Sequence, residues 1–403
     1  MKKGKILWFS TLILSILYIV IGYKISTANF TLMSDPDYKI EKAEVISIEK
    51  NIKETTLQTQ NEEYSKENKS IKETSLIFRC RIASGENEAR ELDAVQIDDE
   101  LTPLNEKKVE VGDKILIFNV PNEKYSTEWV FGSYIRHDKV IVLAAIFFIL
   151  MIVLGFTKGL NTLISLILTC GAVLLVFIPS ILSGHNIYIG TAITSLFIIT
   201  TTLIITNGGS IKTLATTLGC AFGVTVSAIF TLYFDKILKL SGFTNGESIS
   251  LTMLETPVPM NLNAIIFAAI VIGAMGAVMD VAMDISSALY EIKLKVKDIT
   301  AKQLFKSGIT IGRDIMGTMA NTLVLAYIGS SLSTVLILIV TAQTFTELIN
   351  REMIIVEIVQ ALIGSTAILL TIPLTAAICA LLYAEHHTTI TKKETETRKE
   401  TNK

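Results

Sequence analysis

Long apolar runs divide this chain into segments that suit the interior of a membrane and segments that do not. A first run extends from Ile6 to Gly22, and nothing comparable follows before Lys139. Because a helix needs about 20 apolar residues to cross a bilayer, we read each run as one span. The pattern predicts eight transmembrane helices, at about Ile6–Gly22, Val140–Phe156, Leu160–Leu182, Ile187–Ile205, Leu214–Phe234, Ile265–Tyr290, Ile315–Ala342 and Ile354–Tyr383.

Between the first two runs the pattern changes to one that is typical of β-strands. Turn residues such as Ser84-Gly85 and Gly112-Asp113 separate short runs rich in β-branched side chains. The predicted strands are Ala43–Glu49, Ser75–Ile82, Glu91–Ile97 and Lys114–Val120. Residues 51–73 have few apolar side chains, so we expect a mobile loop or an edge strand there. The segment is therefore predicted to be a small β-domain, for which a barrel is one arrangement.

The predicted fold class is an α-helical multi-pass membrane protein with about eight transmembrane helices and a small extracytoplasmic β-domain after the first. We expect a transmembrane anchor in residues 1–23, an extracytoplasmic β-rich domain in 24–138, a seven-helix membrane domain in 139–385 and a polar cytoplasmic tail in 386–403. The start also fits a signal peptide with Ser26-Thr27-Ala28 as the cleavage site. The length of the first run and the position of Lys24 favour an uncleaved anchor.

Composition agrees with a membrane protein. Half of the residues are hydrophobic and only 18% are charged, and the mean hydropathy is +0.52. A soluble chain of this size carries a larger share of charged residues. The net charge of -2 gives no indication of a nucleic-acid partner.

Basic residues mark one side of the predicted bundle. Lysines precede the first helix, crowd the segment from Lys293 to Lys306 and fill the C-terminal tail. With eight spans, all of these lie on one side, which the positive-inside rule assigns to the cytoplasm. Both termini are therefore expected inside and residues 24–138 outside. Lys236, Lys239 and Arg351 are the main exceptions on the opposite side.

Candidate chemistry lies in the polar residues of the apolar spans. At about 100° per residue, one narrow stripe of the sixth span carries polar or small side chains. Its members are Gly273, Gly276, Asp280, Asp284, Ser287 and Glu291. A charged group at the centre of a bilayer costs at least about 2.5 to 3.5 kcal/mol. These acids must therefore face protein, water or an ion.

The last two spans each add one polar face. In the seventh it consists of Asp314, Gly317, Thr318 and Asn321, with Arg313 beside them. In the eighth it consists of Glu357, Gln360, Gly364, Thr371 and Thr375. We expect the three spans to share one polar seam. The candidate ion or proton ligands are Asp280, Asp284, Asp314 and Asn321, supported by Ser287, Glu291, Arg313 and Gln360.

Two interpretations of this seam stay open. Small and polar residues can simply fix the register of packed helices, and Asp314 or Glu291 can form ion pairs with Arg313 or Lys295. Against this, two carboxylates one helical turn apart in a medium of low dielectric repel each other. Asp280 with Asp284 is therefore suited to hold a proton or a cation.

The segment between the sixth and seventh spans carries a helix start. Thr300 and Gln303 form the pattern of a capping box. We expect a short helix over Gln303–Ser307 on the inner membrane surface, with Leu304 and Phe305 toward the lipid.

Other chemistry finds little support. The chain has no phosphate-binding loop, dinucleotide fingerprint or nucleophile elbow, so we expect no enzymatic activity and no cofactor. Cys80 is the only cysteine of the β-domain, which excludes a disulfide within it. His386 and His387 follow Glu385, but this spacing matches no zinc or iron pattern, and the sequence leaves metal binding open.

Two blocks of the chain resemble the YibE/F family of bacterial multi-pass membrane proteins. The first is the run from Gly273 to Glu291, and the second runs from Phe305 to Gly329 and includes Arg313-Asp314 and Asn321. The resemblance implies a location in a bacterial plasma membrane and no established biochemical activity. The β-domain fits the family by position only.

The sequence favours a transporter or channel component with a proton or cation site in the polar seam. The alternative is a non-transporting membrane accessory protein whose exported β-domain binds an exported protein partner. Besides the lipid bilayer, a proton or cation is thus one expected partner and an exported protein the other.

Overall fold

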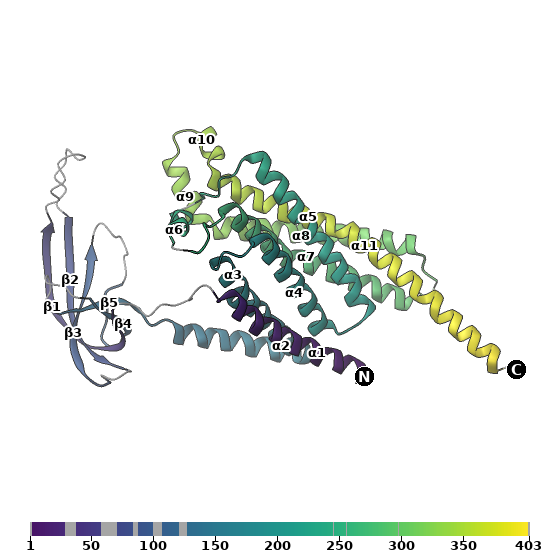
Figure 1. Ribbon diagram of the computed structural model, residues 1–403, viewed down its shortest axis with the longest axis horizontal. Coiled ribbons are helices and arrows are strands. Elements are labelled where there is room, and N and C mark those ends of the chain that lie inside the picture. The colour runs from purple at the N-terminus through teal and green to yellow at the C-terminus, as the bar shows by residue number, and fades with distance from the viewer. Residues whose placement is uncertain are drawn as a thin grey trace. The chain divides into compact units, whose positions relative to one another are not determined.

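The structure is a computed structural model that describes residues 2–28, 38–57, 71–83, 88–99, 107–120, 127–244, 246–254, 256–296 and 298–401. Contacts divide the chain into two compact units. One consists of residues 33–150, and the other consists of residues 1–32 and 151–403. The first contains a β-barrel and the beginning of a helix, and the second is a helix bundle (Figure 1).

The β-strands of the smaller unit close into a barrel. They are β1 Ile40–Leu57, β2 Ile71–Ile82, β3 Glu91–Asp99, β4 Lys114–Asn119 and β5 Trp129–Tyr134, in the order β1-β2-β3-β5-β4. Strands β3 and β5 pair in parallel, and the other neighbours are antiparallel. The predicted small β-domain is thereby confirmed.

Apolar side chains at alternate strand positions fill the barrel, because successive residues of a strand point to opposite faces. The buried core consists of Ala43, Val45, Phe78, Cys80, Ala94, Val109, Ile115 and Ile117. Gln96 is buried as well. Its Nε2 donates to the Lys107 carbonyl at 3.2 Å, and its Oε1 accepts from the Val109 N–H at 3.0 Å. Both ends of the amide are thus hydrogen-bonded, which makes its burial tolerable.

Two features of the barrel differ from the prediction. Strand β5 was not expected. It contains Gly132, where a Cβ would lie 2.4 Å from Phe118 Cε2. Only glycine therefore lets the Phe118 ring lie across the strand. Residues 53–57 pair with residues 71–75. The mobile-loop alternative is therefore wrong for them, and residues 58–70 lie outside the described part.

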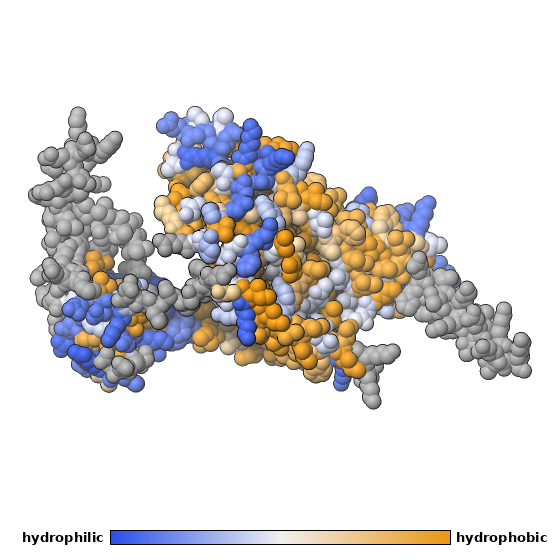
Figure 2. Space-filling model, viewed as in Figure 1, coloured by the Kyte–Doolittle hydropathy of each residue, from blue (hydrophilic) through white to orange (hydrophobic). Residues whose placement is uncertain are grey.

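Helices make up the larger unit and the segment that leads into it. They are α1 Lys2–Ser26, α2 His137–Gly171, the π-helix η1 Ala172–Phe177, α3 Ile178–Leu182, α4 Ile187–Asn207, α5 Ile211–Leu238, α6 Gly246–Thr252, α7 Leu262–Lys295, α8 Ala301–Ser330, α9 Leu332–Thr341, α10 Phe345–Asn350 and α11 Glu352–Thr401. The long helices α1, α4, α5, α7, α8 and α11 lie side by side (Figure 1). Much of the visible outer surface of this unit is hydrophobic (Figure 2), as expected for helices in lipid.

Six helical segments among the described residues are long and apolar enough to cross a membrane, or seven if α8 and α9, bent by 62° at Ser331, form one span. One of the six covers 46 residues from His137 to Leu182. Within it, Phe156 has a non-helical backbone with φ 48° and ψ −127°, close to the predicted boundary between two spans. The number eight stays a prediction.

The predicted surface helix over Gln303–Ser307 is wrong as a separate element. The capping box of Thr300 and Gln303 is present, but it opens α8, which continues without a break to Ser330. Leu304 is completely buried instead of facing lipid, and a Cβ at Gly308 would lie 2.7 Å from the Ala376 Cβ of α11. Packing against α11 therefore holds this segment in the bundle.

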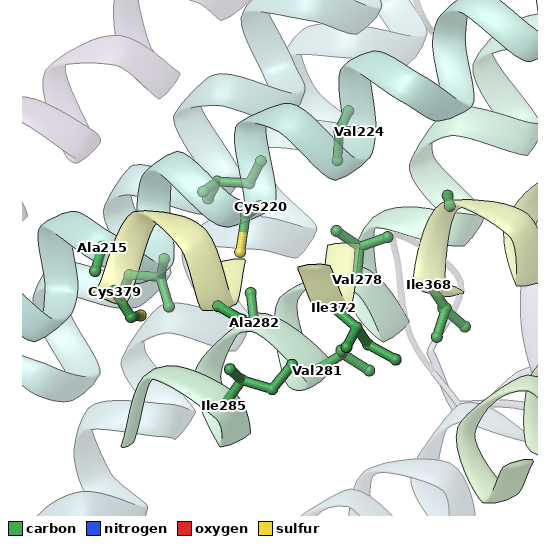
Figure 3. Packing of buried hydrophobic residues seen from close by; sticks show 14 of the residues in the cluster. Ala215, Cys220, Val224, Val278, Val281, Ala282, Ile285, Ile368, Ile372 and Cys379 are labelled. Atoms are coloured by element: carbon green, nitrogen blue, oxygen red, sulfur yellow. The ribbon is translucent and has the colours of Figure 1, made fainter. Parts of the chain in front are cut away.

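Close contacts between α5, α7 and α11 form the centre of the larger unit. A Cβ at Gly219 would lie 2.3 Å from Thr375 Oγ1, and one at Gly223 would lie 2.1 Å from Thr371 Oγ1. Glycine thus lets two backbones approach where any side chain would clash. Figure 3 shows the apolar cluster around this contact, with Cys220 from α5, Ala282 from α7 and residues of α11.

Candidate functional site

The two aspartates of the predicted stripe lie near the middle of α7, on the side that the described chain leaves exposed. Asp280 and Asp284 are exposed, whereas Val281 and Ile285, each one position further, are completely buried. The helical period thus separates a buried apolar face from the acidic one. Gly273, Gly276 and Glu291 are exposed on the acidic face too, and Ser287 is half-buried.

The carboxylates of this face have no partner within the described part of the chain. Neither Asp280 nor Asp284 forms an ion pair or a hydrogen bond with another described residue. The two carboxylates lie close enough to repel each other electrostatically. No cation among the described residues therefore compensates their charge, a state that lipid does not tolerate.

The acidic and basic residues of α8 do not join this pair. Arg313, Asp314 and Asn321 are exposed on α8. Between described residues, Arg313 forms no ion pair with Asp314 or Glu291. The expected ion pairs are thus absent here, and the four candidate ligands do not form one closed site.

Helices α7, α8 and α11 do meet around Tyr327, which the sequence pattern does not single out. A Cβ at Gly273 of α7 would lie 2.5 Å from the Tyr327 hydroxyl. This hydroxyl is buried beside Gln360 and Glu357 of α11, without an aligned hydrogen bond to any described residue. Of the residues predicted to support the ion site, Gln360 is thus the one that lies at this contact. The signal for this contact in the sequence was Gly273, because a glycine in a helix leaves room for a large side chain of a neighbouring helix.

The other polar residues of α11 face a different neighbour. Thr371 and Thr375 are completely buried against the glycines of α5, and Thr371 Oγ1 donates to the Ala367 carbonyl at 2.7 Å. Their burial supports the interpretation that polar residues of the seam fix the packing of the helices. The polar stripe of α11 is therefore divided between two contacts.

A second buried polar contact joins α5, α7 and α11. Ser286 Oγ lies 2.8 Å from Tyr383 Oη, and both side chains are buried. Ser286 Oγ also donates to the Lys212 carbonyl at 3.2 Å, and Tyr383 Oη to the Ser286 carbonyl at 3.2 Å. Sequence reasoning selected the neighbour Ser287 instead. Ser286 could have been recognised from the sequence, because it follows Ala282 by one helical turn and therefore lies on the same face, which is buried.

In the described part of the chain, Asp280 and Asp284 have no further metal-ligating side chain gathered around them. Across the described residues, no three His, Cys, Asp or Glu side chains gather as a metal site needs. The side chains of His386 and His387 lie outside the described part, and all four cysteines are free. Asp280 and Asp284 can offer oxygen ligands to a cation, with water or other groups completing its coordination.

The fold and this site together define a helical membrane protein with an acidic face on one of its long apolar helices and a small β-barrel. The model of the family described as YibE/F-like protein matches residues 143–385. The chain therefore belongs to the YibE/F family, as its sequence blocks predicted, and the matched part contains α7, α8 and most of α11. No curated protein and no solved structure matches the chain.

Proposed function

We propose that this protein is a transporter or channel component that binds a proton or a cation at Asp280 and Asp284. One observation carries the proposal: two carboxylates one turn apart lie near the middle of a membrane-spanning helix, exposed and without a partner among the described residues. A purely structural role requires partners for their hydrogen bonds. Ion binding requires access, and these side chains have it.

The physical reason is the balance of charge. Two adjacent negative charges in low dielectric are unfavourable unless a proton or a cation neutralises one of them. Binding and release of that ion then change the charge of the face, and with it the preference of the face for water or lipid. This coupling between occupancy and environment is what a transport cycle requires.

The proposal includes a location and an orientation. The chain resides in a bacterial plasma membrane with both termini in the cytoplasm and residues 24–138 outside, and it does so without enzymatic activity. The one-sided distribution of lysines supports this orientation. Reporter tags after Lys403 and within residues 293–306 should then report the cytoplasm, and a tag near Asn61 the exterior. An exterior signal from residues 293–306 contradicts the proposed orientation.

The test of function is ion flux in proteoliposomes that contain the purified full chain. The wild type should carry a proton or cation flux that Asp280→Asn or Asp284→Asn abolishes, because asparagine keeps the size but loses the exchangeable charge. Asp298→Asn, the same change in the loop before α8, is the matched control. Thermal stability in detergent is measured in parallel, so that a folding defect is recognised.

The alternative function remains distinguishable in the same experiment. Wild-type flux in the Asp280→Asn, Asp284→Asn double variant contradicts the ion site. Absence of flux from the wild-type protein favours the non-transporting alternative, a membrane accessory protein whose β-domain binds an exported partner. In that case the acidic face of α7 is a protein contact surface, and substitution of the aspartates weakens assembly instead of flux.

A further inference from the structure

A concavity in the smaller unit brings basic residues from three segments together. It has a volume of about 1030 Å³ and lies between the segment 107–114, the end of β5 and the first turn of α2. Its basic residues are Lys107, Lys108, Lys114, Arg136 and Lys139, and its acidic residues are Glu110, Asp113 and Asp138. The lining thus has an excess of positive charge.

Local contacts engage two of the acids and leave this excess unchanged. Asp138 is engaged by Lys114 at 3.7 Å and by His137 Nε2 at 3.0 Å. Asp113 turns one carboxylate oxygen to the Glu110 N–H at 2.8 Å. Two of the three acids are therefore occupied within the lining itself.

Four other bases of the lining, Lys139 among them, have no ion pair within the described residues. Lys107, Lys108 and Arg136 are exposed and form no ion pair with any residue in the described ranges. The Arg136 guanidinium lies over the Tyr134 ring, 5.5 Å from its centre. This contact orients the guanidinium without neutralising its charge.

The position of the concavity along the chain indicates its partner. Arg136 and Lys139 directly precede Val140, where the apolar run of α2 begins. At about 1.5 Å of rise per residue, they lie within a few ångströms of the start of the hydrocarbon-spanning part. Lys107 and Lys108 line the same concavity and thus lie near the same level, where lipid phosphates are found.

We propose that this concavity binds the headgroup of an anionic phospholipid and so fastens the barrel to the membrane surface. Lys107, Lys108 and Arg136 contact the phosphate, and the acyl chains extend along the apolar side chains that follow Val140. The site lies outside the residues that the family model matches. It is independent of the proposed ion site on α7.

The test is native mass spectrometry of the full chain in detergent, titrated with phosphatidylglycerol or phosphatidylcholine. Each basic residue near an anionic surface contributes about fivefold in binding. The Lys107→Gln, Lys108→Gln, Arg136→Gln variant should therefore lose at least about tenfold of the preference for phosphatidylglycerol. The control variant Lys39→Gln, Lys42→Gln, Arg90→Gln changes the charge equally outside the concavity and should keep it.

Three outcomes overturn the proposal. One is an unchanged preference for phosphatidylglycerol in the concavity variant, and another is an equal loss in the control variant. The third is displacement of the lipid by equimolar inorganic phosphate, which indicates a site for a free anion. Circular dichroism and a thermal melt of each variant verify that the barrel has folded, which we expect because all substituted residues are exposed.

Discussion

Glu352 at the start of α11 accepts hydrogen bonds from Ser241, which lies in the segment that follows α5. Its Oε2 accepts from Ser241 Oγ at 2.6 Å, and its Oε1 accepts from the backbone N–H groups of Ser241 and Gly242, each at 2.7 Å. One carboxylate thus closes the end of α5 onto the beginning of α11. A charged acceptor strengthens such bonds.

Glu352→Gln is expected to lower the thermal stability of the protein in detergent. The amide retains one acceptor oxygen for three donors, and loss of bonds to a charged group costs about 1 to 3 kcal/mol, toward the lower end at a partly exposed site. Ser241→Ala removes only the hydroxyl bond and should cost less. Equal melting temperatures for Glu352→Gln and the wild type contradict the importance of this contact.

Removal of the buried contact between Ser286 and Tyr383 should also destabilise the bundle. Tyr383→Phe leaves Ser286 without its side-chain partner, at an expected cost of about 1 kcal/mol. Because both residues belong to one contact, the double variant Ser286→Ala, Tyr383→Phe should cost less than the sum of the two single changes. Ser287→Ala, at the adjacent half-buried position, should be nearly silent. If the costs of the two single changes add up in the double variant, the side chains of Ser286 and Tyr383 do not stabilise each other.

Gly223→Ala tests the close packing of α5 against its neighbours. The added methyl group would lie 2.1 Å from Thr371 Oγ1 and 2.6 Å from Val278 Cγ1. Overpacking of this kind typically costs about 1 to 3 kcal/mol. The control is Gly317→Ala, where no atom apart from the helix's own nearby residues lies within 4 Å of the new Cβ. A melting temperature that falls for Gly317→Ala and not for Gly223→Ala contradicts the described packing.

The thiol of Cys80 should be unreactive in the native protein. Burial, with a smaller contribution from Asp93, raises the pKa of Cys80 from 9.0 to about 12. Maleimide should therefore modify Ser47→Cys, at an exposed position of β1, at pH 7 to 9 while Cys80 reacts only after denaturation. Rapid native labelling of Cys80 contradicts its burial.

The same pKa shift predicts how the stability of the barrel depends on pH. A folded-state pKa above the unfolded value means that the stability contribution of the thiol is complete below about pH 9. It is lost as the pH rises toward 12. In Cys80→Ala this part of the pH dependence should vanish, which chemical denaturation at several pH values can measure.

The first helix is expected to remain in the mature protein. Ser15 of α1 is buried and lies 3.1 Å from Thr201 Oγ1 of α4, and the Tyr18 ring stacks on Phe197 at 4.1 Å. Removal of α1 would expose this polar contact of α4 to lipid. Intact-mass measurement of the purified protein should therefore include residues 1–28. A mass that begins after Ala28 supports a cleaved signal peptide instead.

Local sequence periodicity was sufficient to predict the membrane class, the β-domain and the acidic stripe of α7. Apolar runs and strand alternation are properties of neighbouring residues, so no tertiary information is required to recognise them. The repeat of about 3.6 residues likewise places Asp280 and Asp284 on one face. The two blocks between Gly273 and Gly329 also led to the correct family.

The tertiary structure decided what these faces meet. Periodicity cannot tell whether a polar stripe faces another helix, and here Asp280 and Asp284 are exposed while Thr371 and Thr375 are buried against α5. It cannot pair Ser286 with Tyr383 either, because they are 97 positions apart in the chain. Such contacts arise from packing between distant segments, whose register depends on the shape of all side chains at the interface.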